Sequence, residues 1–190
     1  MGKQLIRISL LLLIWTTLLF SNSDVEILEK QLKSAVGSIR IDLLNSLSKK
    51  YWSISPKKGI DYAIKAIQLA DISGQPKKKA LAYLYGGVNY WAQGAYDNAL
   101  DFYHQSLSVS ESIQDDKGAA FALNNIGMVY QKMKNYPKAL ANYEKAAEIM
   151  GALGDQVEYA KIVNNICEVN ILQGNDEAAL EALAAWPGGM

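Results

Sequence analysis

The sequence is short of the side chains on which most metal centres and catalytic sites depend. Its 190 residues include one cysteine, Cys167, and one histidine, His104. A single cysteine excludes an internal disulfide framework and a multi-cysteine zinc site. The sequence also has no phosphate-binding glycine loop, no HExxH helix and no nucleophile elbow. We therefore predict a non-catalytic protein that needs no metal ion or cofactor.

Neither sign of charge is in excess. Lysine and arginine together number 19, aspartate and glutamate together number 19, and the net charge is zero. Proteins that bind nucleic acid usually carry an excess of basic residues that neutralises phosphates. We therefore expect no nucleic-acid partner. The hydrophobic fraction of 50% is sufficient for a domain with a substantial core.

The longest apolar run lies at the N-terminus. Lys3 and Arg7 precede the apolar residues 8–20, and the small polar residues 21–23 follow. This order is typical of a secretory signal peptide over residues 1–23, and the run is shorter than the ~20 residues that span a membrane. The pattern predicts export to the periplasm or the extracellular space. The alternative is an uncleaved leader that anchors the protein in the inner membrane through residues 8–20.

The remainder of the chain has helical periodicity and repeats itself. Residues 24–37 predict a short leader helix. From residue 38 onward, apolar residues recur three and four positions apart, as on one face of a helix. Equivalent positions lie 40 residues apart, with small residues where helices approach closely and tyrosines around them. The predicted packing positions are Gly87, Tyr90, Ala99, Tyr103, Gly127, Tyr130, Ala139, Tyr143, Ala146, Cys167 and Ala179.

This period predicts an all-α solenoid of about four helix-turn-helix repeats over residues 38–186. The expected repeats lie near residues 39–72, 78–113, 118–150 and 157–186, followed by a short tail over 187–190. Loops longer than a minimal turn are expected between repeats, at 71–79, 111–119 and 151–159, and would explain the period together with slightly extended helices. Trp186 and Pro187 are expected to end the last helix. The apolar C-terminal end suggests a fragment of a longer ancestor or a frame-shifted end.

The best-formed repeat carries a recognisable motif. Leu123, Gly127 and Tyr130, followed by Ala139 and Tyr143, resemble the tetratricopeptide repeat (TPR) pattern. The 40-residue spacing is similar to the N-terminal sensory regions of bacterial TPR-containing histidine kinases and nucleotide cyclases. The resemblance implies a right-handed superhelix whose first helices line a concave groove that holds a protein or peptide.

One position of the first helices suggests how such a groove would bind. Asn45, Asn125 and Asn165 share it, with Tyr85 in the remaining repeat. An asparagine side chain can bind a peptide backbone through both its C=O and its NH2. The other predicted groove residues are Trp91, Phe121, Met128, Lys132, Lys161 and Glu168, with Tyr51, Trp52, Leu81 and Val88 beside them. The alternative is that these asparagines only stabilise the repeat.

Three functions are compatible with these patterns. The first is a non-catalytic module that binds a peptide or protein segment in the groove. The second is a truncated extracytoplasmic sensory region of a histidine kinase or nucleotide cyclase. The third is a structural scaffold that self-associates through its C-terminal repeat.

Overall fold

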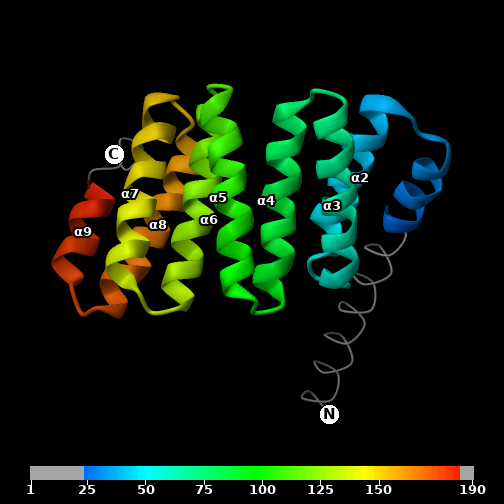
Figure 1. Cartoon of the computed structure of the whole chain (residues 1–190). Helices are drawn as coiled ribbons and strands as arrows, with labels where there is room; N and C mark the ends of the chain where they lie inside the picture. Colours follow the sequence, from blue (N-terminus) through cyan, green and yellow to red (C-terminus); the bar gives the residue numbers. More distant parts are fainter. Residues whose placement is uncertain (1–23, 185–190) are drawn as a thin grey trace, which may run out of the picture.

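The computed structural model describes residues 24–184, which are all-α (Figure 1). A helix over residues 24–34 precedes eight further helices, so this part of the chain has nine. The eight are α2 (Gly37–Tyr51), α3 (Pro56–Ile72), α4 (Pro76–Ala92), α5 (Tyr96–Ser112), α6 (Asp116–Lys132), α7 (Tyr136–Ala152), α8 (Gln156–Leu172) and α9 (Asp176–Ala184). The predicted signal peptide, the predicted tail and Trp186 with Pro187 lie outside the described residues.

The 40-residue period comes from helix length and not from long loops. Each helix from α3 to α8 has 17 residues, and three residues link it to the next helix. The predicted long loops at 71–79, 111–119 and 151–159 are therefore wrong, because the helices extend into both ends of each segment. A helix of 17 residues and a turn of three, taken twice, give the period.

The three-residue turns between α3 and α9 share one backbone conformation. The middle residue has a positive φ, which favours glycine because glycine has no Cβ. Four turns have glycine there, and two have Gln114 (φ 56°) and Lys134 (φ 59°). The third residue donates its N–H to a carbonyl five residues earlier, as Asp115 does to Ser110 at 2.9 Å. This arrangement satisfies carbonyls at the end of the preceding helix.

A tyrosine of the second helix packs on a glycine of the first in the two middle repeats. A Cβ added at Gly127 would lie 2.7 Å from Cδ1 of Tyr143, and one at Gly87 would lie 2.5 Å from Cε1 of Tyr103. Both tyrosines are buried. The ring therefore occupies the space that a side chain on the first helix would need. Of the other predicted packing positions, Ala99, Ala139, Ala146, Cys167 and Ala179 are buried, and Tyr90 and Tyr130 are half-buried.

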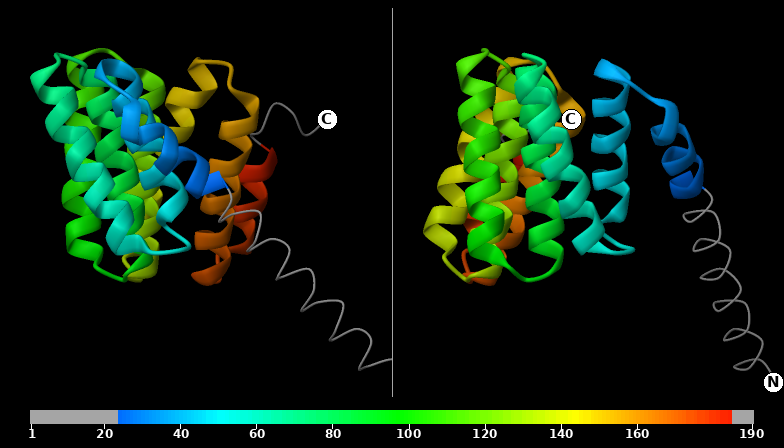
Figure 2. Two further views of the ribbon diagram at one scale, coloured as in Figure 1. Left: turned by 90° about the vertical axis from the view of Figure 1, so that its right-hand side faces the viewer. Right: turned by 45° about the vertical axis from the view of Figure 1, so that its right-hand side comes forward.

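The first helices of the repeats form one side of the solenoid. Contacts join α2 to α4, α4 to α6 and α6 to α8, whereas no two second helices touch within residues 24–184. The second helices are therefore spread apart on the outer side, and the first helices line the inner side. Figure 2 shows the row of helices turned so that its N-terminal end faces the viewer.

The helix over residues 24–34 covers the N-terminal end of the first repeat. Val25 is buried against it, and the Glu29 carboxylate accepts hydrogen bonds from Tyr51 at 2.7 Å and Tyr62 at 2.8 Å. These two bonds lower the pKa of Glu29. Burial, followed by the bond to Glu29, raises the pKa of Tyr62 to about 12. Tyr51, predicted beside the groove, therefore fixes the leader helix instead.

Candidate functional site

Aromatic and apolar side chains from the end of α2 and from α4, α5 and α6 gather between these helices. They enclose a cavity of about 260 Å³. Its lining residues are Trp52, Val88, Trp91, Tyr103, Asn125 and Met128. We call it the tryptophan cavity. It has no charged residue in its lining, and Trp52 at its mouth is 46% exposed. Such a site suits an apolar side chain.

Trp91, one of the lining residues, carries an unused hydrogen-bond donor. Its indole Nε1 is buried and has no acceptor among the described residues. A buried donor without a partner costs about 1–3 kcal/mol, so native proteins rarely leave one without a reason. Nε1 has almost no solvent-accessible surface, so a carbonyl oxygen in the cavity would satisfy it only after the indole turns toward the cavity.

Asn125 contributes an acceptor to the same cavity. Its amide nitrogen donates to the carbonyl of Phe121, one turn earlier, at 2.7 Å. Its Oδ1 has no donor within the described part of the chain. Trp91 and Asn125 thus offer one donor and one acceptor, which are the two groups that complement a peptide unit.

The other two asparagines at this repeat position join neighbouring first helices. Asn45 is only 5% exposed and donates to the carbonyl of Lys78 at 3.0 Å. Asn165 donates to Oδ1 of Asn124 at 3.0 Å. The three amide nitrogens therefore all bond within the protein, and among these asparagines only Asn125 lines the tryptophan cavity. Peptide binding by any of them stays a prediction.

A second cavity of about 540 Å³ adjoins the first between α2 and α4. It is lined by Ser46, Lys49, Lys50, Trp52, Ser53, Tyr85 and Val88, so Trp52 and Val88 belong to both cavities. We call it the lysine cavity. The Lys49 ammonium lies 5.7 Å from the Tyr85 ring centroid, whereas Lys50 pairs with Asp24 at 2.8 Å. Neither lining includes an acidic residue.

The remaining predicted groove residues lie outside these two cavities. Phe121 is half-buried on α6 and Lys132 is exposed at its end. On α8, Lys161 pairs with Glu158 at 2.7 Å, and Glu168 is exposed. Sequence reasoning missed Lys49, because its side chain reaches the groove from the last turn of α2 and the repeat positions alone do not indicate this.

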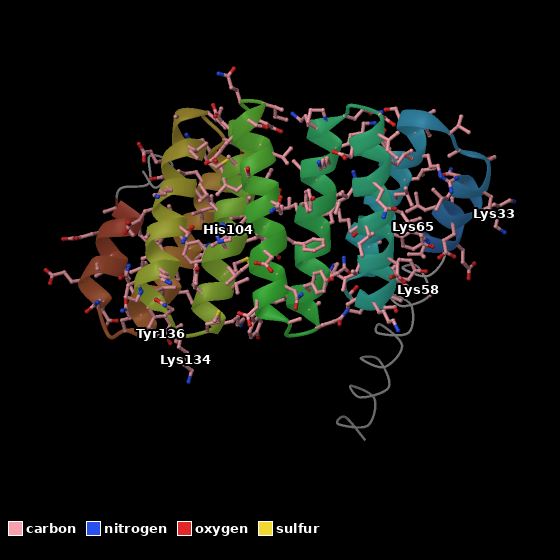
Figure 3. The ribbon with its side chains drawn as sticks, viewed as in Figure 1. Lys33, Lys58, Lys65, His104, Lys134 and Tyr136 are labelled. Atoms are coloured by element: carbon pink, nitrogen blue, oxygen red, sulfur yellow. The ribbon has the colours of Figure 1, made fainter. Side chains whose placement is uncertain are left out.

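The two residues that could have suggested other chemistry have ordinary surroundings. His104 is exposed on the outer helix α5 (Figure 3). Cys167 is buried, its thiol donates to the Ala179 carbonyl at 3.4 Å, and burial raises the pKa of the thiol. Within residues 24–184 no cluster of side chains is suited to a metal ion, and no helix there is long and apolar enough to cross a membrane.

Comparison with known families identifies the repeats. A family model described as "Tetratricopeptide repeat" matches residues 79–150 and 118–185, together more than half of the chain. The chain belongs to the tetratricopeptide-repeat family. TPR proteins are typically non-catalytic, and the repeats of this chain form a protein–protein interaction module in the general sense of the family.

Individual TPR relatives cover only part of the chain. The Photosystem I assembly protein Ycf3 of Rippkaea orientalis is 28% identical over 102 residues, 54% of this chain and 54% of that protein. The Tonsoku-like protein of Mus musculus is 31% identical over 94 residues, 50% of this chain and 7% of that protein. The chain thus spans about half the length of Ycf3 and a small part of the mouse protein.

Solved TPR structures share the fold. A Rap protein complexed with competence and sporulation factor has a TM-score of 0.75 at 18% identity, covering 82% of this chain and 44% of that chain. Aspartyl phosphate phosphatase F from Bacillus subtilis has a TM-score of 0.76 at 14% identity, covering 83% and 42%. MamA has a TM-score of 0.60 at 20% identity, covering 85% and 84%. At these identities the likeness establishes the fold alone. No histidine kinase or cyclase is among the five proteins named above.

Proposed function

We propose that this TPR protein binds an extended segment of a partner protein on the inner face of α2, α4 and α6. An apolar side chain of the segment enters the tryptophan cavity, and its backbone lies across Trp91 and Asn125. The observation that carries the proposal is the uncharged tryptophan cavity, one of whose lining residues, Trp91, has a buried Nε1–H with no acceptor among the described residues.

An extended segment suits this site better than a helix does. The N–H and C=O groups of a helix are bonded to each other along its length. An extended chain keeps both groups free, so it can accept a hydrogen bond from Trp91 and donate one to Asn125 Oδ1. The apolar wall that Trp52, Val88 and Met128 form then excludes water from these bonds. Trp residues in such desolvated pockets often carry much of the binding energy of an interface.

A peptide selection tests the proposal. Randomised 12-residue peptides displayed on phage are selected against the full chain, and the selected peptides are measured by fluorescence anisotropy. Trp91→Phe removes the N–H together with the five-membered ring of the indole, and we expect at least about a fivefold loss of affinity, since the lost hydrogen bond alone is worth ~1 kcal/mol. His104→Ala, on the outer surface, is the matched control and should bind as the unaltered protein does. Selected peptides that bind the Trp91→Phe variant unchanged would refute the proposal.

Self-association is a second candidate, which the last repeat supports. Ile171 on α8 is 59% exposed and Leu180 on α9 is 67% exposed. Apolar exposure at the end of a solenoid favours contact with another chain. Sedimentation at increasing concentration tests this, and a monomer at all concentrations would exclude it.

We also propose that binding takes place outside the cytoplasm. The support is the charged, apolar and small-residue order of residues 1–23. A fusion of alkaline phosphatase after Ser38 should be active if this leader is exported, and an inactive fusion would contradict export.

A further inference from the structure

The lysine cavity indicates which charge the partner segment must carry. Lys49 has no carboxylate within ion-pairing distance among the described residues, and its ammonium lies over the Tyr85 ring at the edge of this cavity. Lys50 is paired with Asp24, but both side chains are about half exposed. The lining of the lysine cavity therefore presents one unpaired positive charge, on Lys49, and one weakly paired positive charge, on Lys50, and it includes no acidic residue.

We infer that the partner segment is acidic, with an aspartate or glutamate two or three residues from its apolar anchor. This inference rests on the proposed function. Trp52 and Val88 line both cavities, so the two sites adjoin. An extended chain advances about 3.3 Å per residue, so two or three residues span about 7–10 Å. A segment anchored in the tryptophan cavity thus places a nearby carboxylate beside Lys49.

Charge complementarity determines the choice of an acidic segment over a basic or neutral one. A lysine or arginine at that position would meet Lys49 and Lys50, and like charges in a partly desolvated groove oppose binding. A neutral segment would leave Lys49 without an ion pair. The Tyr85 ring beneath Lys49 holds the ammonium within the groove by a cation–π contact, so the charge is already positioned.

The test compares three versions of one selected 12-residue peptide. The apolar anchor is kept, and the residues two and three positions away, on either side, are glutamate, serine or lysine. Binding to the full chain is measured by fluorescence anisotropy at low and high salt. We expect the glutamate version to bind about fivefold more tightly than the serine version, the value of ~1 kcal/mol for a partly exposed ion pair. The difference should shrink at high salt because salt screens exposed charges.

Charge reversal in the protein completes the test. Lys49→Glu should invert the order of the three peptides, whereas Lys65→Glu, the same change on the outer face of α3 (Figure 3), should leave it unchanged. Circular dichroism checks that each variant is folded, and Lys49→Gln, which should abolish the preference, serves if the reversal unfolds the protein. Equal binding of the three peptides, with Trp91→Phe still weakening all of them, would overturn the acidic preference and leave the proposed function standing. Binding that does not depend on Trp91 would overturn both.

Discussion

At the junction between the first two repeats, a glycine of α3 faces a buried asparagine of α4, a pairing that the next two junctions lack. Asn89 on α4 is fully buried, and its Nδ2 donates to the carbonyls of Ser48 at 2.9 Å and Tyr85 at 2.7 Å. Its Oδ1 is buried without a donor in the described part of the chain. A Cβ added at Gly59 on α3 would lie 1.8 Å from that oxygen. Gly59 is therefore required because Asn89 occupies the space of its missing side chain.

The next two junctions use an apolar pair at the same repeat positions. Forty residues further on, Ala99 and Val129 replace the glycine and the asparagine, and Ala139 and Val169 do so after another 40. Each alanine and its valine share a buried cluster. The chain thus contains two well-packed pairs at these positions, glycine with asparagine and alanine with valine. A pair that combines alanine with asparagine should destabilise the fold.

The double substitution Gly59→Ala with Asn89→Val tests this reasoning. Gly59→Ala alone should destabilise by about 2–3 kcal/mol, because overpacking and lost hydrogen bonds exceed the gain in helix propensity of about 1 kcal/mol. With Asn89→Val present, the same alanine should stabilise by about 1 kcal/mol, since only the propensity gain and better packing remain. The two substitutions should therefore couple by about 3–4 kcal/mol, at or above the upper end for residues in contact.

Urea unfolding followed by far-ultraviolet circular dichroism measures all four proteins of this cycle. Gly151→Ala is the matched control, because a Cβ there would lie 3.4 Å from its nearest neighbour, Tyr159, and the helix should gain about 0.5–1 kcal/mol. The reasoning is refuted if Gly59→Ala costs the same with and without Asn89→Val.

Two further predictions follow from the turns and from the leader helix. Gln114→Gly and Lys134→Gly should each raise the unfolding free energy by up to about 1 kcal/mol, because a left-handed backbone costs a non-glycine residue about that much; lower urea midpoints would contradict this. Because the pKa of Glu29 is lowered from 4.5 in the folded chain, its bonds stabilise the protein above that pH, and the stabilisation is lost as the pH falls through the lowered pKa. The difference in thermal midpoint between the parent and Glu29→Gln should therefore shrink below about pH 4.5, and a constant difference would contradict it. In a Tyr62→Phe background, Glu29→Gln should lower the thermal midpoint less at neutral pH than it does in the parent protein.

The repeat architecture could be predicted because it depends on local periodicity. The positions of Gly127 and Tyr143 in the 40-residue pattern placed them at one close contact, and the structure brings them together. The long loops were a wrong prediction because polar residues near a helix end look like a loop in sequence. Lys77 to Lys79, for example, belong to the first turn of α4.

The site was less predictable because it depends on neighbours from other repeats. Asn45 and Asn125 occupy the same repeat position, yet Asn45 is buried against the Lys78 carbonyl and Asn125 lines a cavity. The tryptophan cavity combines Trp52 at the end of α2 with residues of α4, α5 and α6, and the lysine cavity depends on how α2 ends beside α4. No spacing within one repeat specifies these arrangements.

The indole N–H resonance of Trp91 tests the central claim most directly. Trp91→Phe assigns this signal in the ¹H–¹⁵N spectrum, since it removes one indole N–H. On addition of a selected peptide, the account predicts that the Trp91 Nε1–H proton moves downfield, as expected for a donor that gains an acceptor. A peptide that binds the full chain while this proton stays at its original position would contradict the account.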